Sequence, residues 1–120
     1  MTTFVSYKNK KTIEERTEEA RKMKDRYPNS IPIIVEKGKR DKTLPDIEKS
    51  KFLVPHDLQY GKFLYIIRKR LKINDTTAIF TFVGNNVLPM STENVSNVYR
   101  NHKDEDGFLY VTYCGENTFG

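Results

Sequence analysis

The 120-residue sequence contains no tryptophan, one cysteine and two histidines. The single thiol, Cys114, cannot form an internal disulfide, and with the distant His56 and His102 it makes no metal-binding cluster. We therefore expect no metal, no cofactor and a reducing compartment. No apolar run approaches the roughly 18 to 20 residues that span a bilayer, and the first residues lack the apolar core of a signal peptide. These absences predict a single soluble, cytoplasmic domain.

Basic residues are scarce in the last part of the chain and outnumber acidic residues in the first part. Residues 1–72 hold 19 Lys and Arg against 10 Asp and Glu, whereas residues 73–120 hold two against six. A basic region of this kind can attract nucleic acid, an anionic membrane or acidic protein segments. The aromatic residues follow strand and helix periodicity and form no exposed stacking row, which disfavours nucleic-acid binding. We expect no specific nucleic-acid partner.

The first half of the chain has the pattern of a helix followed by a strand. Thr12 and Glu15 have the spacing of a capping box, and Pro28 ends the helix. The order of the segment before Thr12 stays open. The apolar face of this helix is expected at Ile13, Ala20, Met23 and Tyr27. The β-branched run over 31–36 predicts a strand, in which Pro32 must stand near the strand start or face a free edge.

A second strand is expected over 51–55, followed by a helix that begins at Asp57. The apolar stripe of this helix consists of Leu58, Phe63, Ile66, Ile67 and Leu71. Further strands are expected over 78–83 and, briefly, over 87–89.

Near the C-terminus the pattern predicts a short helix, a turn and a last strand. Thr92 is expected to cap the helix, and the last strand is expected over 108–113. The turn over 104–107 groups three carboxylates, which we interpret as solvated because adjacent positions in a turn diverge. Residues from Cys114 onward are expected to form an exposed tail.

The order helix, strand, strand, helix, strand, short helix, strand predicts an α+β layer pair. The first two strands would pair like a hairpin, and the last strand would lie beside the first, as in a ubiquitin-like β-grasp.

Four separated motifs occur in a recognisable order. They are RYPNSIPIIVEK at 26–37, KFLVP at 51–55, IIRKR at 66–70 and GFLYVTY at 107–113. Together they closely resemble the autophagy-related protein eight family, the GABARAP-like ubiquitin-like modifiers. The resemblance implies a ubiquitin-like β-grasp with additional N-terminal helices. Its parts would be an N-terminal helical extension at 1–27, a ubiquitin-like domain at 28–114 and an exposed conjugation tail at 115–120.

The family resemblance implies a modifier and not an enzyme. Gly120 would be activated by an ATP-using enzyme, carried as a thioester by a conjugating enzyme and joined to phosphatidylethanolamine. Glycine suits this role, because without a Cβ it can thread a narrow channel and leave its carboxylate unhindered. Phe119 and Arg70 match the residues that the family's processing cysteine protease recognises. The expected location is the cytoplasm and, after lipidation, the autophagosome membrane.

The resemblance also implies an adaptor for receptor peptides of the form aromatic-x-x-aliphatic, received as an added strand beside the second strand. The aromatic pocket carries over to Glu19, Met23, Pro32, Ile34, Lys51, Leu53 and Phe108. The aliphatic pocket carries over to Phe52, Val54, Pro55, Leu58, Phe63 and Ile66. Lys49 and Lys51 would attract the acidic residues that often flank such peptides.

Two other functions are compatible with parts of the sequence. A non-lipidated interaction module, or a modifier attached to proteins, would have the same fold and differ only in the acceptor amine. A small basic nucleic-acid-binding domain is a more distant alternative. An enzyme is disfavoured, because Cys114 has no neighbouring histidine in the sequence and no glycine-rich phosphate loop occurs.

Overall fold

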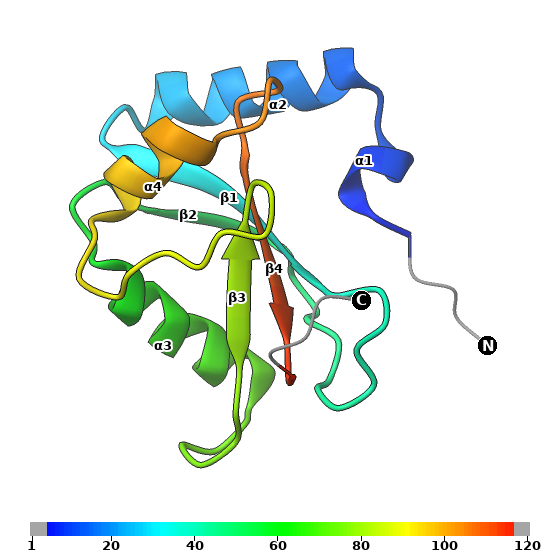
Figure 1. The fold of residues 1–120 in the computed structure, drawn as a ribbon. Helices are drawn as coiled ribbons and strands as arrows, with labels where there is room; N and C mark the ends of the chain where they lie inside the picture. The colour runs from blue at the N-terminus through cyan, green and yellow to red at the C-terminus, as the bar shows by residue number, and fades with distance from the viewer. Residues whose placement is uncertain (1–4, 117–120) are drawn as a thin grey trace.

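The computed structural model of the chain describes residues 5–116, which form four helices and four strands (Figure 1). In chain order these elements are α1 (Tyr7–Lys10), α2 (Ile13–Arg26), β1 (Ser30–Lys37), β2 (Lys51–Pro55), α3 (Tyr60–Leu71), β3 (Phe80–Val83), α4 (Val95–His102) and β4 (Leu109–Cys114). The segment before Thr12, whose order the sequence left open, contains the one-turn helix α1. No helix within residues 5–116 combines the length and the hydropathy of a membrane span.

The four strands form one mixed sheet in the order β2-β1-β4-β3. β1 pairs antiparallel with β2 and parallel with β4, so the predicted neighbours of the first strand are confirmed. Pro32 is the third residue of β1, and pairing with β4 begins one residue later at Ile33. The proline, which has no N–H to donate, therefore stands near the strand start as predicted.

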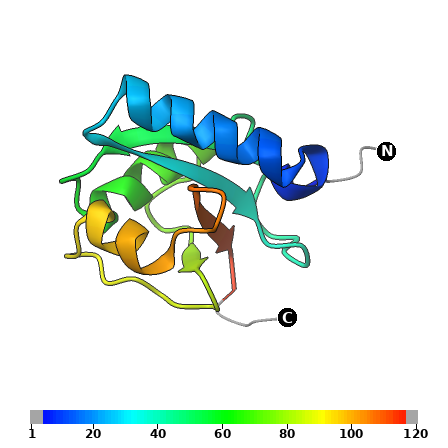
Figure 2. The same cartoon turned by 90° about the horizontal axis from the view of Figure 1, so that it is seen from above.

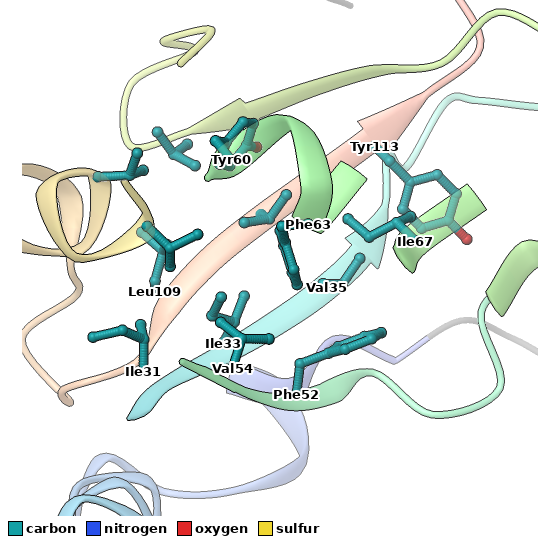
Figure 3. Packing of buried hydrophobic residues seen from close by; sticks show 14 of the residues in the cluster. Ile31, Ile33, Val35, Phe52, Val54, Tyr60, Phe63, Ile67, Leu109 and Tyr113 are labelled. Atoms are coloured by element: carbon teal, nitrogen blue, oxygen red, sulfur yellow. The ribbon is translucent and has the colours of Figure 1, made fainter. Parts of the chain in front are cut away.

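Helices cover both faces of the sheet, with α1 and α2 on one side and α3 on the other (Figures 1 and 2). Ile33 and Val35 of β1 point into the larger core with Phe63 and Ile67 of α3 (Figure 3). The intervening Ile34 packs on the other side in a smaller cluster with Tyr7, Ala20 and Phe108. This two-sided cover explains why β1 is an unbroken apolar run, with five consecutive buried residues.

Helix α2 begins with the predicted capping box. The Thr12 hydroxyl accepts from the Glu15 amide at 3.1 Å, and the Glu15 carboxylate accepts from the Thr12 amide at 2.9 Å. Its buried residues are Arg16 and Ala20. Tyr27 was expected on this face and is instead 48% exposed. It is the residue after the helix, at φ −132° and ψ 74°, so the helical spacing no longer directs its side chain.

Helix α3 begins at Tyr60, three residues after the predicted start at Asp57. The backbone of the preceding turn and of Tyr60 itself bonds to the start of α4 and to the residues just before it. The Tyr60 amide donates to the Glu93 carbonyl, and the Val95 amide donates to the Leu58 carbonyl, both at 2.8 Å. Bonds to this distant segment therefore replace a first helical turn.

Strand boundaries also differ from the sequence prediction. β3 begins at Phe80 and not at residue 78, and the short strand expected over 87–89 is only an isolated bridge between Val83 and Val87. The last strand, expected over 108–113, begins one residue later, so Phe108 precedes β4. Cys114, expected in the tail, is the last residue of β4 and pairs with Phe80.

Candidate functional site

Strand β2 lies at one edge of the sheet and pairs with β1 alone among the strands of the described part of the chain. An edge strand presents backbone N–H and C=O groups that a further strand can use. The predicted site residues gather around this edge, and the pairing register divides them between the two faces of the sheet.

The residues predicted for the aromatic pocket come together on the face covered by α2. Leu53 lies opposite Pro32, and Lys51 lies opposite Ile34, so all four point to the same face. On this face Ile34 and Phe108 belong to one buried cluster, against which Met23 packs. We refer to the predicted aromatic-pocket residues as the α2-face set.

The residues predicted for the aliphatic pocket gather on the opposite face, under α3. Phe52 and Val54 alternate with Leu53 along β2, and both belong to the larger core. The Phe52 ring meets the Phe63 ring edge to face, with 5.6 Å between ring centroids. Leu58 and Ile66 pack against the same core while staying partly exposed. We refer to the predicted aliphatic-pocket residues as the α3-face set. Pro55, the exposed last residue of β2, is the exception among them, because it lies opposite Ser30 and alternates to the α2 side of the sheet.

The two sets contain residues of two kinds. The buried members form the floors and hold the fold together; they are Pro32, Ile34, Phe52, Val54, Phe63 and Phe108. The accessible apolar members are Met23, Leu53, Pro55, Leu58 and Ile66. Only the second group offers surface to a ligand without a rearrangement of the core.

The α2-face set includes two charged side chains, Glu19 and Lys51, and further lysines lie near it. Glu19 forms ion pairs with Lys51 and, at 3.3 Å, with Lys11. Lys49 is exposed nearby along the chain. Lys11 was absent from the predicted site, because its nearness to Glu19 arises from the bend between α1 and α2 and not from a helical spacing. The Glu19 carboxylate therefore partly neutralises both Lys51, a predicted site residue, and Lys11.

Arg70, predicted as a contact of the processing protease, lies beside the α3-face set. Its guanidinium carbon is 4.6 Å from the centroid of the Phe52 ring, in a cation–π contact. Arg70 also lines a cleft of about 560 Å³ together with Ile66, Lys69 and Asp46. The basic residues at the C-terminal end of α3 therefore lie next to the apolar residues of the α3-face set.

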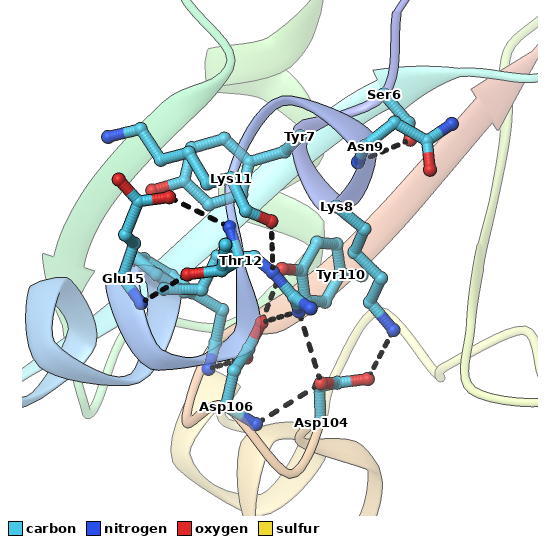
Figure 4. A network of polar contacts seen from close by, with 12 residues as sticks. Ser6, Tyr7, Lys8, Asn9, Lys11, Thr12, Glu15, Asp104, Asp106 and Tyr110 are labelled. Carbon is cyan, nitrogen blue, oxygen red and sulfur yellow. Dashed lines mark hydrogen bonds and ion pairs between the residues drawn. The ribbon is translucent and has the colours of Figure 1, made fainter.

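In the turn over 104–107 Glu105 is exposed as expected, but Asp106 is only 1% exposed. Figure 4 shows the polar network around Asp106. Its carboxylate accepts from the Arg16 guanidinium at 2.6 Å and from the Tyr110 hydroxyl at 2.5 Å. Its other oxygen accepts from the Phe108 amide at 2.8 Å. Burial, followed by the bond to Asp106, raises the pKa of Tyr110. This network fixes Phe108, the floor of the α2-face set.

Arg16 was not singled out in the sequence, although its spacing carried a signal. It lies four residues before Ala20, and this places it on the buried face of α2. A cation on a buried helical face requires a buried partner, but the sequence does not indicate which of the distant carboxylates supplies it. The partner, Asp106, is 90 residues away.

Phe119 and Gly120, the predicted conjugation residues, lie outside the described residues. Within them, Cys114 is half-buried, and its sulfur lies 3.2 Å from the Glu116 carbonyl oxygen. Burial raises the pKa of the Cys114 thiol. In residues 5–116 no three His, Cys, Asp or Glu side chains are grouped to hold a metal ion.

The arrangement of helices and sheet has a close counterpart among solved structures. The crystal structure of Trypanosoma brucei ATG8 matches with a TM-score of 0.87 and 38% sequence identity, over 98% of this chain and 100% of that chain. The fold is therefore the ubiquitin-like β-grasp with additional N-terminal helices, as the sequence predicted.

Sequence relatives identify the family. A family model described as autophagy protein Atg8, ubiquitin like, matches residues 15–120. Autophagy-related protein 8e of Arabidopsis thaliana is 52% identical over 114 residues, which are 95% of this chain and 92% of that protein. Autophagy-related protein 8 of Mycosarcoma maydis is 50% identical over 115 residues, or 96% of each chain. The chain belongs to the Atg8 family of ubiquitin-like autophagy proteins, so the predicted family is confirmed.

Proposed function

We propose that the protein is a lipid-conjugated modifier that also binds short peptides. Gly120 is joined to phosphatidylethanolamine on autophagosomal membranes, and the β2 edge receives aromatic-x-x-aliphatic peptides as an added strand. The protein is the substrate of activating and conjugating enzymes and of a processing cysteine protease, and it moves between cytoplasm and membrane. Membership of the Atg8 family supports the conjugation, and the geometry around β2 supports the peptide binding.

The observation that carries peptide binding is the division of the site between the two faces of the sheet. Side chains of an added strand alternate between the faces, so two anchors three positions apart point to opposite faces. The α2-face set and the α3-face set lie on opposite faces at one free edge. The spacing of the peptide motif therefore matches the geometry of the site.

Replacing an accessible residue on each face should weaken peptide binding. We expect the double variant Leu53→Ala, Ile66→Ala to raise the Kd of an aromatic-x-x-aliphatic peptide at least about tenfold, which corresponds to 1.4 kcal/mol. Each substitution removes apolar contact area from one anchor. Calorimetry with the peptide is the measurement, and micromolar binding is expected for the unmodified protein, because a flexible peptide loses conformational freedom on binding.

Leu88→Ala is the matched control, because Leu88 is 48% exposed and lies in the loop after β3. Phe52 is avoided, because it is only 6% exposed and truncating a buried phenylalanine costs about 3 to 5 kcal/mol of stability. If the double variant folds and still binds the peptide with wild-type affinity, the assignment of peptide binding to the two face sets is wrong.

Cys114 is expected to play no chemical part in conjugation. Its raised pKa keeps the thiol protonated near neutral pH, and a thiol is a weaker nucleophile than a thiolate. Cys114→Ser should therefore acquire lipid at the wild-type rate in a reconstituted reaction. Loss of the adduct from a variant with unchanged circular dichroism would show that the thiol takes part.

A further inference from the structure

The loop between β1 and β2 holds the end of β4, where the chain leaves the sheet. We refer to residues 38–46 as the clamp loop. The Gly38 amide donates to the Tyr113 carbonyl at 2.8 Å. The Gly115 amide, one residue beyond β4, donates to the Asp41 carboxylate at 2.7 Å. Gly115, expected at the start of an exposed tail, is therefore half-buried and bonded to the body of the protein.

The Asp41 carboxylate is itself held in place by its own loop. It accepts from the Thr43 hydroxyl at 2.9 Å and from the Leu44 amide at 3.0 Å. Leu44 is only 6% exposed and belongs to the larger core, so the loop is anchored in the fold. Burial acts to raise the pKa of Asp41, but these hydrogen bonds and the one from Gly115 outweigh it and lower the pKa. Asp41 is thus ionised at neutral pH.

Gly115 also packs closely against the clamp loop, and this contact is independent of the hydrogen bond to Asp41. A Cβ on residue 115 would stand 2.0 Å from the Thr43 hydroxyl oxygen and 3.3 Å from Leu44. The backbone of residue 115 therefore approaches the clamp loop so closely that a Cβ at this position would require a shift of the Thr43 side chain. The hydrogen bond and the close approach together define how the chain emerges from β4.

We propose that Asp41 is a positioning residue for conjugation, which directs the tail out of β4 so that its terminal carboxyl group enters the channels of the activating and conjugating enzymes. This inference rests on the proposed function. A tail loses conformational freedom when it enters an extended channel, and fixing Gly115 beforehand reduces that loss. Asp41 contacts the chain five residues before Gly120, so it acts through Gly115 and not on the reacting carboxylate.

The test compares Asp41→Ala with Asp46→Ala in ATP-dependent activation of the protein by its activating enzyme. Asp46 lies in the same loop, and its side chain is 77% exposed in an ion pair with Lys37. Asp41→Ala should raise the KM for the protein about five- to tenfold and leave kcat unchanged, since the charge-assisted hydrogen bond that holds the Gly115 amide is lost before the chemical step. Asp46→Ala should behave as the wild type. Asp41→Asn, whose amide oxygen can still accept, should recover part of the KM.

A second variant and two physical measurements separate positioning from general destabilisation. Gly115→Ala should raise KM in the same way, because the added Cβ would displace the Thr43 hydroxyl, which donates to Asp41. Amide hydrogen exchange at residue 115 should accelerate in Asp41→Ala. The affinity for peptides at β2 should stay at the wild-type value, because Asp41 lies outside both face sets.

The outcomes distinguish this inference from the function on which it rests. If the wild type acquires lipid and Asp41→Ala keeps the wild-type KM, the positioning role is wrong and the proposed function stands. A fall in kcat together with weakened peptide binding at β2 would also overturn positioning, because it would indicate that Asp41→Ala disturbs the fold as a whole. If the wild type never acquires lipid, both the proposed function and the inference fail.

Discussion

Asp106→Ala should lower the free energy of unfolding by about 3 to 5 kcal/mol, the usual cost of breaking a buried ion pair by removing one partner. The substitution removes the carboxylate that Arg16, a residue only 8% exposed, contacts at 2.6 Å, and leaves it the more distant Asp104 carboxylate at 3.9 Å. It also removes the acceptor of the Tyr110 hydroxyl and of the Phe108 amide. Urea unfolding followed by circular dichroism at neutral pH measures the loss.

Asp25→Ala provides a matched control, because it removes an ion-pair partner on α2, the helix that also carries Arg16. Asp25 pairs with Arg21, also at 2.6 Å, but both side chains are more than half exposed. Exposed pairs contribute about 0 to 1 kcal/mol, because water solvates and screens the two charges. Equal losses in Asp106→Ala and Asp25→Ala would show that burial does not decide the strength of the Asp106 contact.

Deleting Gly120 should abolish lipid attachment. The shortened chain still ends in a carboxylate, but that carboxylate belongs to Phe119, whose side chain is expected to clash in a channel suited to glycine. Lipid attachment is therefore expected to fail because the Phe119 side chain clashes, and not because a carboxylate is missing. Reconstitution with activating enzyme, conjugating enzyme, ATP and phosphatidylethanolamine liposomes, read by intact mass, measures it.

Two measurements accompany the Gly120 deletion. Peptide affinity should be unchanged, because the residues of both face sets lie within residues 5–116. Gly120→Ala, which adds only a methyl group at the same chain length, should retain more activity than the deletion if the block is steric. A deletion variant that still gains lipid would exclude Gly120 as the acyl donor.

Most of the fold could be predicted because its signals are local. The capping box at Thr12, the β-branched run of β1 and the apolar stripe of α3 each depend on neighbouring residues of the sequence. The predicted pairing of the first and last strands is also confirmed. The family resemblance supplied the grouping of site residues that periodicity alone does not provide.

The errors arose where distant contacts override local preference. The start of α3 moved because the 56–59 turn bonds to the first residues of α4, over 30 residues away. Asp106 looked like a solvated turn residue, and only the fold brings Arg16 beside it. Asp41 was likewise invisible, because its bond to Gly115 spans 74 residues. Sequence periodicity carries no information about such pairs.

The most direct test of the account is the tandem mass spectrum of the wild-type protein after reconstituted conjugation. The account predicts one added phosphatidylethanolamine with loss of one water, since the lipid amine forms an amide with the Gly120 carbonyl and the enzyme thiol leaves. Fragmentation should place the lipid on Gly120. An unmodified protein in the presence of its own enzymes, or an isopeptide bond to a lysine of another protein, would contradict the account.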